Sequence, residues 1–426
     1  MTSPLYVERL ILDDIRCFGH LDIQFSKPGE SIVVIGDNGD GKSTVLRCLA
    51  MGICDQSSAS ALFREMYGEF VRAGSRRGYG TVDVQFAGRG RDRFRIVTKI
   101  KSSKAFERVE QRLFRVRDNR TKNLTQDEFP WERIFATGYG PGIRVQGTSD
   151  FDYHLTVDAV YPLFRYDVLL QNPELMVRRL IEAARQEHGN RHAGIVLTQI
   201  KALLARVLQL DGPNQVYLEP NGIFVKGPSG KVSLAALSDG FRGTVTWVLD
   251  LVSWWFLYRR GWGSKQFLDV HGIVLIDEVE QHLHPRWQRN IMRLLTESFR
   301  HVQFVATTHS PLVASGCEGI PVNRLKDGKH DVVEPFGWLA EDVYEAMGVP
   351  SSRAEKFRQD FLAEFTALNL KRLRGSATAI ELRRLTRDRH QLDALPGTDP
   401  LRLTTEIKNI RGHLTREMKS KVKGRS

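Results

Sequence analysis

The stretch that most constrains the fold of this 426-residue chain is "GDNGDGKST", Gly36–Thr44. It follows the apolar run "SIVVI" and precedes "VLRCLA", so a strand leads into the loop and a helix leads out of it. Glycines let successive backbone N–H groups point inward and cradle phosphate oxygens, and the start of the helix adds a favourable dipole for an anion. The pattern predicts a phosphate-binding loop in a fold that alternates strands and helices.

The same pattern predicts ATP and Mg²⁺ as cofactors. Lys42 is expected to reach the β- and γ-phosphates, and Ser43 to ligate Mg²⁺. The loop residues expected to contact the nucleotide are Gly36, Asn38, Gly39, Gly41, Lys42, Ser43 and Thr44.

A pair of acids follows a second apolar run, "GIVLIDEVEQHLHP". Such a run is typical of a buried parallel strand that delivers a carboxylate to the carboxyl edge of a sheet, where α/β proteins bind ligands. Asp277 is expected to hold the Mg²⁺ shell, and Glu278 to orient and deprotonate the attacking water. His282 and His284 lack the spacing of a metal site, and a structured loop before a helix at Pro285 is favoured.

The remaining pattern predicts strands and helices in alternation, and hence a mostly parallel sheet covered by helices. Strands are expected within residues 4–36, at 272–277 and 302–308, with a hairpin from 81–88 and 93–102 and a β-meander at 215–234. Helices are expected at 42–54 and 59–74, at 173–210 with a break at Gly189-Asn190, after Ser238, from Pro285, from Pro311 and through the last eighty residues.

Four motifs in order, "GDNGDGKST", "LSDGFRG", "VLIDEVEQHLHP" and "VATTHSP", resemble the ABC-type ATPase heads of the structural-maintenance (SMC), RecF and overcoming-lysogenization-defect (OLD) group. The second and third look most like the ATPases of Septu-type and retron-linked phage-defence systems, as do "FATGYGPG" and "DVYEAMGVPSS". The resemblance implies an α/β head with a mostly parallel core sheet, an antiparallel β subdomain, a short helical insertion and a helical C-terminal extension.

The resemblance also implies roles for residues outside the phosphate loop. In that family two heads sandwich two ATP molecules, and the signature loop of one head completes the site of the other. Here Ser238 and Gly240 match that loop, with Arg242 as a helper, and His309 matches the histidine that contacts the γ-phosphate. Arg16 matches a position from which an arginine approaches the phosphates.

Two features of the family stay open in this sequence. Gln85 and Gln146 are both candidates for the glutamine that touches Mg²⁺, although Gln85 alternates with apolar residues and fits a solvent-facing strand position equally. The transporter motif LSGGQ is missing, and nothing after His309 matches a Toprim or HNH nuclease.

The domain organisation follows from these motifs. We expect residues 1–165 to form the N-terminal half of the head, 166–212 a helical insertion, 213–335 the C-terminal half of the head, and 336–426 a basic helical extension. From Lys371 to Ser426 there are 15 Lys and Arg against 6 Asp and Glu, which is +9 of the chain's +12. Such a segment is expected to bind nucleic acid or an acidic partner, or to be a solvated helical face.

Composition bounds the remaining questions. Four cysteines without ligand spacing predict a reduced, cytoplasmic protein, and we find neither a signal peptide nor a run long enough to span a membrane.

The leading hypothesis is an ATPase that forms a homodimer, or a higher even oligomer, around ATP and regulates a separate nuclease or other effector in anti-phage defence. The alternatives are a RecF-like DNA-binding repair protein and, less favoured, a transporter motor.

Overall fold

The structure is a computed structural model. It describes residues 3–66, 70–88, 90–102, 107–118, 120–141, 156–165, 168, 170–185, 191–227, 230–237, 239–258, 270–281, 283–347 and 353–393. The chain divides into two compact units, Met1–Val349 and Pro350–Ser426.

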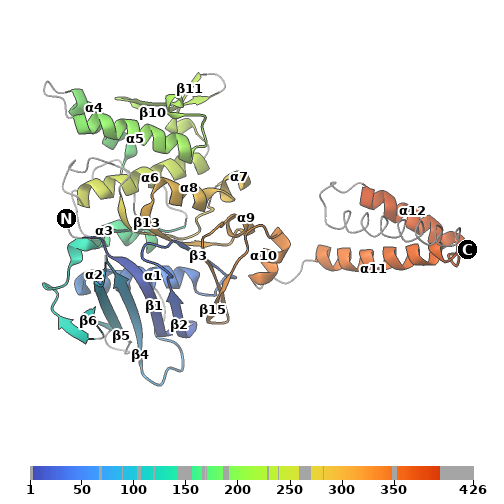
Figure 1. The fold of residues 1–426 in the computed structure, drawn as a ribbon, viewed down its shortest axis with the longest axis horizontal. Helices are drawn as coiled ribbons and strands as arrows, with labels where there is room; N and C mark the ends of the chain where they lie inside the picture. The colour runs from blue at the N-terminus through green and yellow to red at the C-terminus, as the bar shows by residue number, and fades with distance from the viewer. Residues whose placement is uncertain are drawn as a thin grey trace, which may run out of the picture. The chain divides into compact units, whose positions relative to one another are not determined.

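A mostly parallel sheet forms the centre of the first unit (Figure 1). Its strand order is β15-β14-β3-β13-β12-β8, and within it β15 alone runs antiparallel to its neighbour. The strands β3, β12 and β13 are almost entirely buried, as expected for apolar runs covered on both faces. Their bounds are β3 (Ile32–Ile35), β8 (Ala136–Tyr139), β12 (His271–Ile276), β13 (His301–Thr308), β14 (Val322–Lys326) and β15 (Lys329–Val333).

A second, antiparallel sheet has the order β2-β1-β4-β5-β6-β7. One face is apolar and packs into the core, and the other is polar: in β5, Phe94, Ile96 and Ile100 are buried and alternate with Arg95 and Lys99. The strands are β1 (Tyr6–Ile15), β2 (Phe18–Gln24), β4 (Tyr79–Ala87), β5 (Arg93–Ser102), β6 (Glu107–Arg117) and β7 (Arg120–Leu124).

Helix α1 (Lys42–Gly52) lies between the two sheets. Its apolar residues share one core with the inner face of the antiparallel sheet and with Ile273 and Leu275 of β12. At its end, a Cβ on Gly52 would lie 2.4 Å from Cγ2 of Val84, so the helix sits directly on β4. Helix α2 (Gln56–Arg64) follows, and its N-cap is Asp55, whose carboxylate accepts from the backbone N–H groups of the first turn.

Helices cover the opposite face of the parallel sheet (Figure 1). The 20-residue α6 packs there together with α4, α5 and α8. A three-stranded meander of order β11-β10-β9 packs against α4 and α5. The helices are α3 (Thr156–Val160), α4 (Pro173–Arg185), α5 (Arg191–Val207), α6 (Asp239–Tyr258), α7 (Pro285–Gln288), α8 (Ile291–Ser298), α9 (Pro311–Ser315) and α10 (Ala340–Ala346). The meander strands are β9 (Val216–Glu219), β10 (Gly222–Gly227) and β11 (Gly230–Ser233), and the short 3₁₀ turns are Trp131–Arg133, Tyr161–Leu163, Pro213–Gln215 and Leu234–Ala236.

The second unit contains the helical hairpin α11 (Arg353–Leu373) and α12 (Ala379–Asp393). Phe365, Leu368 and Leu385 form its small core. Ion pairs between the two helices join Lys371 to Glu381 and Arg384 to Glu364.

The fold class expected from the sequence is confirmed: a mostly parallel core sheet, an antiparallel second sheet and covering helices are all present. One expected helix is wrong in its extent. The helix predicted over residues 59–74 starts earlier, at Gln56, and ends at Arg64, and Val71 instead forms a β-bridge with Ile15. The expected domain boundaries remain a prediction, and among the helices that the structure describes none is long and apolar enough to cross a membrane.

Candidate active site

The phosphate loop connects β3 to α1, as its sequence predicts. Gly41 has φ 92°, and a Cβ there would lie 2.5 Å from Cζ of Phe18, so only glycine fits. The Lys42 ammonium is buried and donates to the carbonyl oxygens of Gly36 (3.0 Å) and Asp37 (2.9 Å). Lys42 therefore arches back over the loop in which it was expected to hold phosphates.

Asp277 follows the last residue of β12 and is held from both neighbouring strands. Its backbone N–H donates to the carbonyl of Tyr139 in β8 (2.8 Å), and its Oδ1 accepts from the hydroxyl of Thr307 in β13. The side chain is 1% exposed, yet Oδ2 has no hydrogen-bond partner among the described residues. A buried carboxylate oxygen without a donor is a costly arrangement, and a cation would relieve it.

Glu278 stands on a strained turn directly after this strand. Its φ is 50°, in the left-handed region that residues other than glycine seldom adopt. Its backbone N–H donates to the Thr307 hydroxyl at 2.9 Å, so this one hydroxyl holds both members of the acid pair. Unlike Asp277, Glu278 is only partly buried. The two adjacent carboxylates therefore lie in different surroundings, one buried and one partly open to solvent.

His309 follows β13 at the same edge of the sheet. Its backbone N–H donates to Oε1 of Glu280 at 2.6 Å, which fixes the start of the "HSP" turn. Burial lowers the pKa of His309 and the positive charge of Lys42 lowers it further, against the attraction of Glu280 and Asp277. Burial likewise lowers the pKa of Lys42, opposed by charges that include Asp277 and Glu278. These mutual effects place Lys42, the acid pair and His309 in one electrostatic environment.

Arg16 reaches the same region from the turn between β1 and β2. Its φ is 45°, and Nη1 donates to Oγ1 of Thr44 at a long 3.4 Å. The guanidinium lies 5.9 Å from the ring centroid of Phe70, and burial lowers its pKa. The contact with Thr44 places Arg16 beside the phosphate loop, and its approach to the phosphates remains a prediction.

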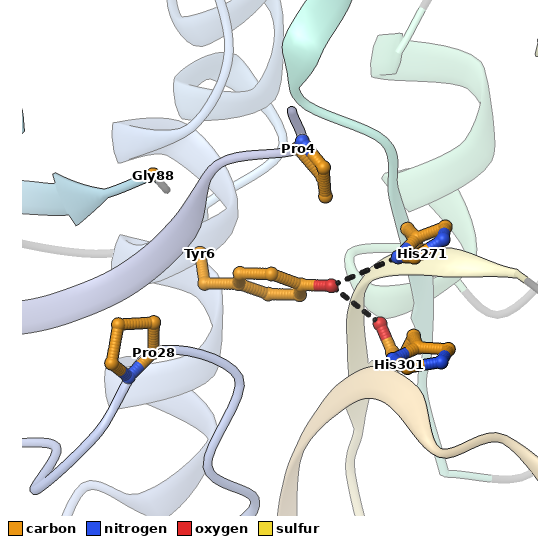
Figure 2. A pocket seen from close by; sticks show the side chains of 6 residues that line it. All are labelled: Pro4, Tyr6, Pro28, Gly88, His271 and His301. Carbon is orange, nitrogen blue, oxygen red and sulfur yellow. Dashed lines mark hydrogen bonds between the residues drawn. The ribbon is translucent and has the colours of Figure 1, made fainter. Parts of the chain in front are cut away.

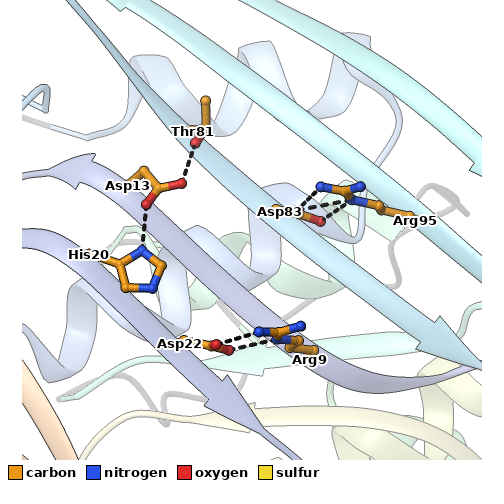
Figure 3. Close-up of polar contacts among 7 residues, drawn as sticks. All are labelled: Arg9, Asp13, His20, Asp22, Thr81, Asp83 and Arg95. Carbon is orange, nitrogen blue, oxygen red and sulfur yellow. Dashed lines mark hydrogen bonds and ion pairs between the residues drawn. The ribbon is translucent and has the colours of Figure 1, made fainter. Parts of the chain in front are cut away.

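Gln85, by contrast, is not brought to this place. Gln85 lies on the polar face of the antiparallel sheet, between Arg9 and Arg95, whereas its neighbour Val84 faces α1. Figure 3 shows this polar face, on which Asp83 and Arg95 pair. Gln85 therefore points away from the helix that carries Ser43. Gln146 lies outside the described residues, so the glutamine-loop residue stays unassigned.

The signature loop is described in part. Ser238 and His282 lie outside the described residues, whereas Gly240 is the second residue of α6 and its carbonyl accepts from the Thr244 hydroxyl at 2.8 Å. Within the described part of the chain, no hydrogen bond joins Gly240 to the phosphate loop of the same molecule. The role expected for it, in the site of a second head, remains a prediction.

Three residues that support the site are not apparent from the sequence motifs: Thr307, Tyr139 and Glu280. Thr307 places a hydroxyl inside a buried strand. The sequence could have indicated its supporting role, because buried hydroxyls take hydrogen-bond partners. Tyr139 fixes Asp277 through its backbone and donates its own hydroxyl to Oδ2 of buried Asp250 at 2.9 Å. Glu280 was visible only as a third acid.

A separate cavity of about 170 Å³ lies at the opposite ends of β12 and β13 (Figure 2). Pro4, Tyr6, Pro28, Gly88, His271 and His301 line it. The Tyr6 hydroxyl donates to the carbonyl of His301 at 2.9 Å and lies 3.2 Å from Nδ1 of His271. Since His271 and His301 begin the strands whose far ends lead to Asp277 and His309, this cavity is not part of the site.

The donor set fits ATP and Mg²⁺. The loop offers backbone N–H groups and a buried ammonium for phosphates, and the unpartnered Oδ2 of Asp277 is the kind of oxygen that Mg²⁺ takes. Ser43, at the start of α1, would supply a hydroxyl to the same ion.

The comparison with known families agrees with this geometry. Residues 31–315 match the family described as "AAA domain, putative AbiEii toxin, Type IV TA system". The chain belongs to this family. The match runs from β3 to the end of α9 and so includes the phosphate loop, the acid pair and His309.

Relatives of this AAA-domain chain include a Septu protein and a retron ATPase. The Septu protein PtuA of Bacillus mycoides (strain KBAB4) is 24% identical over 317 residues, which cover 73% of this chain and 39% of that protein. The retron Ec83 probable ATPase of Escherichia coli is 32% identical over 150 residues, which cover 33% of this chain and 27% of that protein. The alignments therefore span well under two thirds of the length of these two relatives.

A third relative is matched along most of its length. The retron Vc95 probable ATPase of Vibrio cholerae serotype O1 biovar El Tor is 23% identical over 421 residues, covering 82% of this chain and 80% of that protein. Among solved structures, the SMC head domain from Thermotoga maritima aligns with a TM-score of 0.42 at 16% identity, over 77% of this chain and 98% of that one. The likeness to Septu and retron ATPases that the motifs predict is confirmed by the Septu and retron relatives.

Proposed function

We propose that this AAA-domain chain binds ATP with Mg²⁺ and hydrolyses it. The observation that carries the proposal is the buried, unpartnered Oδ2 of Asp277, held at the carboxyl edge of the parallel sheet near Lys42. In this proposal the loop backbone and Lys42 bind the phosphates, and Ser43 and Asp277 hold the metal ion. A bound Mg²⁺ supplies charge neutralisation at the β- and γ-phosphates.

Glu278 is the proposed general base. Its backbone is fixed by Thr307, its carboxylate is only partly buried, and it adjoins the metal-binding position. A carboxylate so placed can orient a water molecule and accept its proton. His309, whose lowered pKa favours the neutral imidazole at pH 7, is proposed to donate a hydrogen bond to the γ-phosphate.

Two heads are proposed to close around ATP, in a homodimer or a higher even oligomer. Ser238 and Gly240 of one head would then complete the site of the other. The placement of Gly240 at the start of α6 supports this, because a helix N-terminus favours an anion. Closure driven by ATP would be a two-state element that a partner can bias.

The partner in this proposal is a separate nuclease or other effector, in a system of anti-phage defence. The names of the Septu and retron relatives support the defence context. A short segment of the first unit supports a protein partner, since several of its large apolar side chains are exposed and exposed apolar surface marks interaction sites. These side chains are Val332, Phe336, Trp338, Leu339 and Tyr344.

The test is Glu278→Gln, which keeps the shape of the side chain and removes its basicity. The variant is expected to bind ATP as the wild type does, to release phosphate at least about 100-fold more slowly, and to accumulate dimers on a sizing column with ATP and Mg²⁺. Glu297→Gln on the exposed face of α8 is the matched control and should change neither measurement. Wild-type turnover by Glu278→Gln would exclude Glu278 as the base, and a monomer that persists with bound ATP would exclude closure of two heads.

A further inference from the structure

The outer, polar face of the antiparallel sheet carries paired charges over β1, β2 and β4 (Figure 3). Arg9 pairs with Asp22 of the neighbouring strand, at 2.5 Å between Nη2 and Oδ2. Arg95 of β5 pairs with Asp83 of β4. The carboxylate of Asp13 is taken up by His20 and Thr81. This part of the face is close to neutral.

The same face changes character at the end of β5 and the start of β6. In the strand register Lys101 lies opposite Arg108, Lys99 opposite Glu110, and Val97 opposite Arg112. We call Lys99, Lys101, Arg108 and Arg112 the basic patch. Its four cations face one acid, Glu110, which Lys101 (3.5 Å) and Arg108 (3.3 Å) share.

The patch is open to solvent and extended by the chain before β4. Lys101, Arg108 and Arg112 are exposed, and Arg112 forms no ion pair with any residue that the structure describes. Arg76 and Arg77 are also exposed and come two or three residues before Tyr79, which lies opposite Lys101 on β4. Among the described residues, positive charge therefore exceeds negative charge at this end of the sheet.

We propose that the basic patch binds the phosphate backbone of double-stranded nucleic acid. Its charge is the first reason: a duplex carries one negative charge per ~1.7 Å of its axis, and cations that contact it release condensed counterions. Lys99 and Lys101 are about 7 Å apart along β5, and Arg108 and Arg112 about 13 Å apart along β6, at ~3.3 Å per residue. Four cations thus form a ridge along the strands.

The surroundings of the patch favour backbone contacts. The ammonium of Lys99 lies 3.5 Å from the ring centroid of Tyr79, and the guanidinium of Arg95 lies 5.9 Å from that of Phe114, so cations cover both rings. Rings covered in this way do not offer a stacking platform for unpaired bases.

An acidic protein is the less suitable partner. Protein interfaces are built around an apolar core. Among the described residues, the large apolar side chains that are exposed lie at 195, 332–344 and 370–382, none of them in the antiparallel sheet.

The basic patch gives the proposed ATPase a second kind of ligand. The experiment that tests this proposal does not require ATP turnover. The full chain, without nucleotide, is titrated into a fluorescein-labelled duplex of about 30 base pairs, and anisotropy is read from ~50 to ~200 mM salt. The variant is Lys101→Gln, Arg108→Gln, Arg112→Gln, in which each replaced side chain is exposed. We expect affinity at ~100 mM salt to fall at least about fivefold, and the slope of log K against log salt to decrease by about 2–3, because each neutralised phosphate contributes ~0.9 to that slope.

The matched control removes the same charge at the far end of the sheet. Arg117→Gln, Arg120→Gln, Lys122→Gln changes three exposed cations at the β6–β7 turn, about 30 Å along β6 from Arg108. This variant should bind within about twofold of the wild type, and so should the charge-preserving variant Lys101→Arg, Arg108→Lys, Arg112→Lys.

Several outcomes would overturn the proposal. A wild-type protein that does not bind the duplex would overturn it directly. Unchanged binding by the patch variant would assign the affinity to another surface, such as the basic C-terminal segment. Equal losses of affinity in the patch variant and in the control at the β6–β7 turn would mean that the affinity depends on net charge alone. Polyglutamate that displaces the duplex at equal charge would indicate an acidic protein partner.

Discussion

The hydroxyl of Thr307 can be removed with little change of shape by Thr307→Val. The threonine donates to Oδ1 of Asp277 and accepts from the N–H of Glu278 at 2.9 Å, and it is fully buried. The substitution leaves the carboxylate oxygen and the N–H group without these partners. A lost hydrogen bond to a charged group costs about 1.5–3 kcal/mol, and an unsatisfied buried donor about 1–3 kcal/mol.

Together these losses amount to about 2.5–6 kcal/mol in the free energy of unfolding. With an entropy of unfolding of ~2.1 cal/mol/K per residue over the unit Met1–Val349, the melting temperature should fall by about 3–8 °C. The assay is differential scanning calorimetry of wild type and variant at pH 7.

Two companion variants separate this effect from generic damage to the core. Thr307→Ser keeps the hydroxyl and should restore most of the stability. Ser298→Ala removes a buried hydroxyl that has no hydrogen-bond partner among the described residues, so it should melt close to the wild type. A Thr307→Val protein that melts within about 1 °C of wild type would refute the reasoning that this hydroxyl holds the acid pair.

The remaining predictions concern charge. Lys42→Ala removes the ammonium expected to bind the phosphates and should abolish ATP binding in isothermal titration calorimetry, whereas retained full affinity would contradict the assignment of the loop. Burial raises the pKa of Asp250 to about 7 from an ordinary 3.8, so the folded chain binds this proton more tightly than the unfolded chain. The stability that this group contributes is complete below pH ~4 and is lost as pH rises to about 7. Between pH ~5 and ~8, the free energy of unfolding of the wild type should fall by about 2–3 kcal/mol more than that of Asp250→Asn. Equal losses of stability in thermal melts of both proteins would contradict this prediction.

The phosphate loop and the acid pair were predictable because each is a short pattern with a local structural cause. Gly41 must be glycine where φ is positive, and the apolar run before Asp277 must be a buried strand. Both elements lie where the sequence predicts them.

Other elements depend on pairing that no local pattern encodes. Strand β8 has four residues, Ala136–Tyr139, and becomes a strand because β12 lies beside it. Strand β6 carries charged side chains on both faces, and β7 carries charged side chains on one face and Thr121 and Asn123 on the other, which hides the period-2 alternation. Residues 65–74 have helical spacing, but pairing of Val71 with Ile15 takes the chain away from a helix.

The residues that support the site could not be predicted for the same reason. The partners of Thr307 lie about thirty residues away along the chain, directly after the neighbouring strand β12. Gln85 illustrates the opposite error, since its residue type fitted an expected role whereas the pleat of β4 turns it to the far face.

The order of the core strands sets a condition on synthesis in the cell. Strand β3, which ends in the phosphate loop, pairs with β13 in the register Ile35 to Thr308, a separation of 273 residues. At ~5–20 residues per second a ribosome needs roughly 15–55 s to cover that interval. During this time the edges of β3 have neither β13 nor β14 to pair with. The nascent AAA-domain chain is therefore a candidate client for chaperones that shield unpaired strands until β14 (Val322–Lys326) emerges.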